Sequence, residues 1–170
     1  MKHLKFLLFL LLFGISSQAQ KVDNFTLKSV TDNSTFSLKK AKGNFIVLHF
    51  LLKTECPYCI RHTSEYFEKS NTLSNVIQVF IKPDNKEEIK EWAKKIKSNN
   101  SFPIYQDIDA KLADKLNIPY GYQFHGQVVH YPALIILNKK GEEVFRYIGK
   151  NNSDRYSFEK LKMKIEELNN

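Results

Sequence analysis

The sequence contains little cysteine, since Cys56 and Cys59 are the only two among 170 residues. A fold held together by disulfides needs several bridges, and a domain of this size can stand on its hydrophobic core without them. A bridge between these two cysteines would also close a very short loop and add little stability. The composition therefore excludes a disulfide framework, and the pair has to be explained by its chemistry.

The sequence also lacks an apolar run long enough for a transmembrane helix. The run at residues 6–13 is well short of the roughly 18–20 residues that a span needs. It follows Lys2 and Lys5 and is succeeded by small residues up to Ala19, which is the pattern of a secretory signal peptide. We therefore expect a signal peptide at residues 1–19, an exported protein that is periplasmic or secreted, and no stable membrane span after cleavage.

No stretch of the chain concentrates its positive charge. The formal net charge is +8, and removal of the two lysines of the signal peptide leaves +6. The remaining lysines are scattered and interleaved with Glu and Asp, as on a solvated surface, whereas a nucleic-acid groove would gather them. We expect no nucleic-acid partner, and a monomer.

Strand and helix patterns alternate through residues 20–170, with no repeat, low-complexity tract or linker between them. The apolar runs 45–52 and 76–81 are typical of strands buried on both faces. Helical spacing or a hairpin pattern accounts for most of the rest: helices at 57–70, 85–97, 107–118 and 153–168, and a hairpin at 133–148. This order predicts one domain, an α/β three-layer α/β/α sandwich with a mixed central sheet.

The cysteines lie where the first buried strand gives way to a helix. Pro57 suits the first helical position, because its missing N–H costs nothing there. Cys56 would then meet the unpaired N–H groups at the positive end of the helix, which favour a thiolate, and we expect it to face solvent. Cys59, one turn further on, would be covered and well placed to attack a mixed disulfide formed on Cys56.

Metal binding is an alternative explanation of the pair. A structural zinc site uses four Cys or His ligands, and the chain has no second pair at ligand spacing. His62 and His130 would be the histidines to consider as further ligands. We expect no metal and no other cofactor, the redox-active Cys56–Cys59 pair being the reactive group, and keep a metal- or copper-handling module as a third hypothesis.

The motif CPYC at the start of a helix, followed far downstream by YPALIIL and KKGEEVFRYIG, resembles the thioredoxin-like superfamily. The resemblance covers the chain from about residue 22 onwards. The leader and the segment FPIYQDIDAKLADKLNI are most similar to exported thiol–disulfide oxidoreductases and to the related alkyl hydroperoxide reductase/thiol-specific antioxidant branch. The resemblance implies a thiol–disulfide oxidoreductase in which Cys56 is the nucleophile and Cys59 the resolving thiol. Its partners would be protein thiols and disulfides and an upstream electron donor.

The same resemblance implies a surface around the cysteines that contacts the substrate. Pro132 would be the cis-proline of the superfamily, and Tyr131 before it would present its backbone to the substrate. Pro57 and Tyr58, between the cysteines, complete the expected set. The aromatic-rich stretch 118–132 either packs only on itself or, as we expect, forms one wall of the substrate groove.

Glu55, His49 and His62 are expected to modulate the site, and the first two depart from the family pattern. Glu55 replaces the usual tryptophan and would raise the pKa of Cys56, which Arg61 and His62 would partly offset. His49 lies near the position at which thioredoxins have a buried acid that assists the resolving thiol. It is either a proton shuttle or, as the alternation of buried residues along its strand favours, a core residue.

The sequence before Cys56 also differs from the peroxidase pattern P-x-x-x-[TS]-x-x-C, which would place its hydroxyl residue at Lys53 and its proline at His49. A peroxiredoxin-like thiol peroxidase is therefore the second hypothesis, with both signature residues missing.

Overall fold

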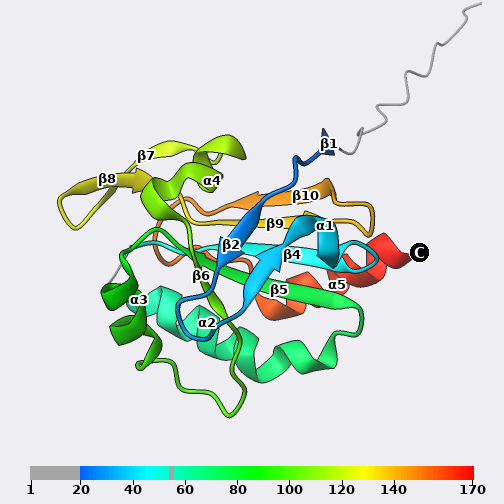
Figure 1. Ribbon diagram of the computed structural model, residues 1–170, viewed down its shortest axis with the longest axis horizontal. Coiled ribbons are helices and arrows are strands. Elements are labelled where there is room, and N and C mark those ends of the chain that lie inside the picture. Colours follow the sequence, from blue (N-terminus) through cyan, green and yellow to red (C-terminus); the bar gives the residue numbers. More distant parts are fainter. Residues whose placement is uncertain (1–19, 54–55) are drawn as a thin grey trace, which may run out of the picture.

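The computed structural model describes residues 20–53 and 56–170, so the predicted signal peptide and Glu55 lie outside the described residues. A six-stranded sheet forms the middle of the molecule (Figure 1), in the order β1 (Gln20–Lys21), β10 (Glu142–Ile148), β9 (Ala133–Leu137), β4 (Phe45–Phe50), β5 (Val76–Lys82) and β6 (Ile104–Gln106). β4, β5 and β6 are parallel, whereas β9 is antiparallel to both β4 and β10. The sheet is mixed, as predicted.

β4 lies in the interior of this sheet and shows why its sequence is an unbroken apolar run. All six of its residues are buried. Phe45 and Val47 belong to the core on one face of the sheet, and Ile46 and Leu48 belong to the core on the other. A strand covered on both faces has no solvent side on which polar residues would alternate.

Helices cover both faces of the sheet. One face carries α2 (Pro57–Lys69), α3 (Lys86–Ala93) and α5 (Phe158–Asn169), each of which contributes buried residues to the same core as Phe45. The other face carries α1 (Leu38–Ala41), α4 (Lys111–Lys115) and the small sheet formed by β2 (Thr26–Lys28) and β3 (Thr35–Ser37). The short turns η1 (Ser70–Thr72) and η2 (Ile108–Ala110) complete the arrangement. The predicted three-layer α/β/α sandwich is confirmed.

The helix predicted at 107–118 is shorter than its pattern suggests. Asp109 and Ala110 adopt left-handed backbone angles, with φ of 58° and 54°, and these residues separate η2 from α4. The Asp107 carboxylate accepts hydrogen bonds from the backbone N–H groups of Leu112 (2.8 Å) and Ala113 (3.0 Å). Asp107 thus caps α4 from outside the helix, because the kink brings its side chain to the unpaired N–H groups.

Residues 118–132 contain a hairpin, which the sequence pattern did not predict. β7 (Tyr120–Phe124) and β8 (Gln127–His130) pair with each other and form a sheet of their own. The turn between them has left-handed angles at His125 (φ 48°) and Gly126 (φ 73°), as two-residue hairpin turns require. The His-Gly pair between aromatic-rich runs was the available signal. The hairpin projects at the left of Figure 1.

Candidate functional site

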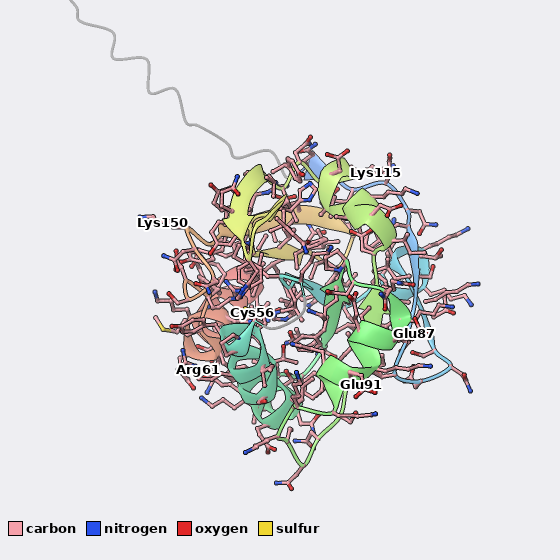
Figure 2. The ribbon with its side chains drawn as sticks, turned by 90° about the vertical axis from the view of Figure 1, so that its left-hand side faces the viewer. Cys56, Arg61, Glu87, Glu91, Lys115 and Lys150 are labelled. Atoms are coloured by element: carbon pink, nitrogen blue, oxygen red, sulfur yellow. The ribbon has the colours of Figure 1, made fainter. Side chains whose placement is uncertain are left out.

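Cys56 and Cys59 lie at the N-terminus of α2, at the carboxyl end of β4. Figure 2 looks onto this end of the molecule, with Cys56 at the start of α2. Cys56 is the N-cap residue: its Sγ accepts a hydrogen bond from the backbone N–H of Cys59 at 3.2 Å, and Pro57 is the first helical residue. Both cysteines are free thiols. The predicted strand-to-helix junction is therefore confirmed for the pair.

The burial of Cys56 corrects the expectation that it faces solvent. Cys56 and Cys59 are both 0% exposed. The Cys56 side chain is directed inward because its sulfur accepts the N–H of Cys59 and lies beside a guanidinium group. Pro57 is the exposed residue at this point, and Tyr58 is half-buried with Arg61 over its ring.

That guanidinium belongs to Arg155, which no motif in the sequence marks. Its Nη2 lies 3.2 Å from Sγ of Cys59 and 3.6 Å from Sγ of Cys56. Its Nη1 donates to the carbonyl oxygens of Asn151 (3.2 Å) and Asp154 (3.1 Å), which hold the side chain in place. Arg155 is 96 residues from Cys59 in the sequence, so only the tertiary fold brings the two together.

The pKa values of the two thiols are shifted in opposite directions in this arrangement. Burial raises the pKa of Cys59, but the hydrogen bond from Cys56 and the positive charges of Arg155 and Lys82 outweigh it and lower that pKa to about 6. The hydrogen bond to Cys59 and burial raise the pKa of Cys56. The pair therefore carries one thiolate near neutral pH, mainly on Cys59, with the remaining proton between the sulfurs. This differs from the expectation that the helix N-terminus places the thiolate on Cys56.

Lys82, at the end of β5, is a second cation near the pair. Its side chain is completely buried, and its Nζ donates to the carbonyl oxygen of Leu52 at 2.6 Å. The same Nζ pairs with the Asp84 carboxylate at 3.1 Å and lies 4.4 Å from the centre of the Trp92 ring. Lys82 thus holds the chain that leads from β4 towards Cys56, and its positive charge helps to lower the pKa of Cys59.

The loop that carries Arg155 is itself fixed at several points. The Asp154 carboxylate accepts from the backbone N–H of Lys150 (2.9 Å) and from the Tyr147 hydroxyl. The backbone N–H of Asn152 donates to the Tyr122 hydroxyl of the hairpin at 2.9 Å. These bonds tie the loop to β10 on one side and to β7 on the other.

Pro132 lies against this loop, but its peptide bond differs from the expectation. The described residues contain no cis peptide bond, so the bond between Tyr131 and Pro132 is trans. Tyr131 donates its N–H to the Pro119 carbonyl oxygen at 2.9 Å, which extends the hairpin pairing and leaves that N–H engaged within the protein. Pro132 accepts from the N–H of Gly149 at 2.8 Å, and it lines a small cavity of about 10 Å³ with Arg155. The trans form is also the intrinsically preferred one, by about 0.5–1 kcal/mol.

His49 and His62 form a buried pair behind the cysteines. Nδ1 of His49 lies 3.2 Å from Nε2 of His62, and Nε2 of His49 lies 2.7 Å from Oε1 of Gln78. With the amide oxygen as acceptor, His49 carries its proton on Nε2 and accepts one from His62. The His49 ring also stacks on Phe80, with centroids 4.5 Å apart. His49 is therefore a hydrogen-bonded core residue, as the alternation favoured.

The histidine pair is uncharged at neutral pH. Burial lowers the pKa of His49 to about 4, and burial together with the neighbouring His49 and Arg155 lowers the pKa of His62 well below its usual value. Neutral His62 does not supply the positive charge that was expected to offset Glu55. Arg155 and Lys82 supply positive charge instead.

The histidines considered as metal ligands are used in other ways. His62 is bonded to His49 in the core, whereas Nε2 of His130 lies 3.8 Å from Oδ1 of Asp114. Among residues 20–53 and 56–170, no three His, Cys, Asp or Glu side chains come together as a metal ion would require. The geometry thus offers the metal hypothesis no support in this part of the chain.

Fold and site together define a thioredoxin-like protein with a paired-cysteine centre. The fold is shared with a yeast mitochondrial 1-Cys peroxiredoxin at a TM-score of 0.76 and 14% identity, covering 89% of this chain and 75% of the other. It is shared with the exposed lipoprotein thioredoxin of Streptococcus pneumoniae at a TM-score of 0.65 and 19% identity, covering 85% of this chain and 99% of the other. A secreted disulfide oxidoreductase of Mycobacterium tuberculosis is similar at a TM-score of 0.62 and 18% identity, covering 84% of this chain and 95% of the other. No curated protein is significantly similar in sequence.

The AhpC/TSA family model matches residues 19–144, and the chain belongs to the AhpC/TSA family. Membership of this family makes it a thiol-based redox enzyme of the oxidoreductase or peroxidase kind. None of the helices formed by the described residues combines the length and the apolar character needed to cross a membrane.

Proposed function

We propose that this protein is an exported thiol–disulfide oxidoreductase that acts on protein disulfides and thiols through Cys56 and Cys59. The observation that carries the proposal is the contact of one guanidinium, that of Arg155, with both sulfurs of a CxxC pair at a helix N-terminus. A cation shared by two sulfurs stabilises a thiolate on either of them, as exchange between a mixed disulfide and a dithiol requires.

The reaction transfers two electrons from the dithiol to the client. The proton of Cys56 passes to Cys59, and the Cys56 thiolate attacks one sulfur of the client disulfide; an S–S bond forms and the other client sulfur leaves as a thiolate. This leaving thiolate takes the proton from Cys59, and the Cys59 thiolate then attacks the sulfur of Cys56 and releases the second client sulfur as a thiolate. The products are a Cys56–Cys59 disulfide and a reduced client, and an upstream thiol donor restores the dithiol. Because neither sulfur is exposed, the groups that cover Cys56 have to move before a client reaches it.

The roles of the two cysteines are tested by trapping. The Cys59→Ser variant keeps the attacking thiol without its resolving partner, so mixed disulfides with client proteins should accumulate in the exported fraction of the native host. The Cys56→Ser variant should trap nothing. Acid-quenched samples on non-reducing gels report the traps, and the intact mass of the recovered protein should correspond to a chain that begins at Gln20. Traps on Cys56→Ser would reverse the roles, and a retained leader would contradict export. Absence of traps with tight zinc or copper binding would favour the metal hypothesis.

A thiol peroxidase is the second candidate, and family membership favours it. Its pocket pattern would use the positions of Lys53 and His49. Lys53 donates to Gln127 at 3.0 Å, and His49 is buried in its bonded pair, so neither offers the hydroxyl and proline of that pattern. In the same preparations we expect hydrogen peroxide to oxidise the dithiol at the rate of an ordinary thiol in stopped-flow measurements. An oxidation faster by orders of magnitude would make peroxidase the better assignment.

A further inference from the structure

A cavity of about 260 Å³ lies at the carboxyl ends of β4 and β5, and neither cysteine lines it. One wall consists of residues 51–53, the chain that leads from β4 towards Cys56. The opposite wall consists of residues 127–131 of the hairpin. Figure 1 shows the hairpin and α4 at the same end of the molecule as the start of α2. The stretch 118–132 does more than pack on itself, since it closes one side of a cavity beside the cysteines.

Two exposed apolar side chains, those of Tyr120 and Val128, line this cavity. Within the described residues the exposed large apolar side chains are Ile108, Tyr120, Val128 and Met163. Tyr120 and Val128 line the cavity, and Ile108 directly precedes two lining residues. Met163 is carried by α5, which lies away from the hairpin in Figure 1. Exposed apolar side chains around a concave site are typical of a binding surface.

The charged groups that line the cavity already have partners. The Asp107 carboxylate accepts two backbone N–H bonds, and Asp109 pairs with Lys111 at 3.5 Å. Lys53 donates to Gln127 across the two walls at 3.0 Å. With these groups engaged, the cavity presents no cluster of like charges to attract an ionic ligand, and the aliphatic and aromatic side chains that share its lining with the polar groups offer a surface for an apolar one.

The cavity is close enough to the cysteines to serve the same client. Lys53 lies three residues before Cys56, and successive Cα atoms are 3.80 Å apart, so their Cα atoms are separated by no more than about 11 Å. An extended chain advances about 3.3 Å per residue. A client side chain in the cavity would therefore lie within about four residues of the cysteine bonded to Cys56.

We propose that this cavity binds an apolar side chain of the client polypeptide, close in sequence to the cysteine that is attacked. The proposal rests on the function proposed above and names a feature of the substrate. An apolar cavity of about 150 Å³ holds benzene, so 260 Å³ has room for the side chain of leucine or phenylalanine. Drug-sized ligands fill about 300–1,000 Å³, so the cavity is small for a nucleotide or a comparable cofactor.

The experiment uses short peptides of glycine and one cysteine, each joined to a chromophoric thiol by a disulfide. A single leucine is placed in turn at each of about four positions on either side of the cysteine. The reduced protein should cleave at least one leucine peptide with a kcat/KM about tenfold above that of the all-glycine peptide, equivalent to about 1.4 kcal/mol. Val128→Lys, which places a charge at the mouth, should bring that ratio close to one. Met163→Ser is the matched control and should keep the preference.

Each remaining outcome overturns a distinct claim. Equal rates with every peptide would remove this cavity from client recognition, as would a preference that survives in Val128→Lys. A wild-type dimer that Val128→Lys converts to a monomer, seen by sedimentation, would assign the surface to a second copy of the chain and overturn the proposal. Reduction of hydroxyethyl disulfide is measured in parallel to distinguish a failure of this proposal from a failure of the proposed function. A protein that cannot reduce this small disulfide lacks the dithiol activity itself.

Discussion

At the scale of single residues, the guanidinium of Arg155 is the positive charge that contacts both sulfurs of this centre. Nη2 of Arg155 is 3.2 Å from one sulfur and 3.6 Å from the other, and burial of both cysteines removes the water that would screen its charge. The helix N-terminus acts in the same direction through the N–H of Cys59. Desolvation opposes both, and the hydrogen bond from Cys56 and the charges of Arg155 and Lys82 together lower the pKa of Cys59 in spite of it.

Replacement of Arg155 by Met should raise the pKa of the dithiol by about 1–3 units, because a nearby opposite charge shifts a pKa by that amount. The thiolate fraction should then fall most between pH 6 and 8 and become equal to that of the wild type at high pH. The ultraviolet absorbance of the thiolate, followed against pH, measures the shift. Arg61→Met, on the same helix but over the Tyr58 ring, is the control. An unchanged midpoint in Arg155→Met would show that the cation does not act on the sulfurs.

At the scale of elements, the loop between β10 and α5 fixes the arginine, and Gly149 begins it. A Cβ at Gly149 would clash with the Asp154 carbonyl oxygen and lie 3.0 Å from Cγ of Pro132. The first of these neighbours is backbone, which does not move without moving the loop. The absence of a side chain at this position therefore allows the loop to close against Pro132 and to hold Arg155 over the cysteines.

Gly149→Ala should destabilise the protein by about 1–3 kcal/mol, the usual range for overpacking. The sign is informative, since Gly→Ala at an unstrained site stabilises by about 0.4–1 kcal/mol through the unfolded chain. Urea unfolding measures the change, with Lys150→Ala at the exposed next position as the control. A second readout is the thiol pKa, which should rise as Arg155 is displaced. Stability equal to or above the wild type would contradict the close approach.

At the scale of the whole molecule, the buried histidine pair links folding to pH. His49 and His62 stay neutral in the core, whereas in the unfolded chain they take up protons as the pH falls below about 6.5. The unfolded state then binds more protons than the folded state, so the free energy of unfolding decreases as the pH falls. For His49 the loss begins near pH 6.5 and is complete only below its folded pKa of about 4.

The expected loss from His49 is on the order of 3 kcal/mol between pH 7 and pH 4. Asp32 and Asp154, whose pKa values are lowered by hydrogen bonds, also lose stabilisation in acid, so the measurement has to separate the two effects. Urea unfolding of the His49→Leu/His62→Leu double variant does this, because only the histidine part of the pH dependence should disappear. Identical pH dependence in the double variant and the wild type would mean that the pair is not neutral in the core.

The sequence by itself determined the features that depend on neighbours along the chain. The apolar run at β4 marked a strand buried on both faces, Pro57 marked the start of α2, and the two-residue spacing placed Cys56 just before this helix and Cys59 in its first turn. These properties follow from backbone geometry and local burial, which operate over a few residues. Fold class and the reactive pair were therefore within reach of the sequence.

Tertiary structure decided what surrounds the pair. Arg155 contacts the sulfurs of Cys59 and Cys56 from 96 and 99 residues away. Lys82 approaches from β5, and the hairpin lines the cavity together with residues 51–53. No local pattern marks an arginine in a loop as a thiolate partner, and the burial of Cys56 depends on groups from several elements. Electrostatic potential and solvent exclusion act through space, so the thiol pKa and the cavity existed only once the chain had folded.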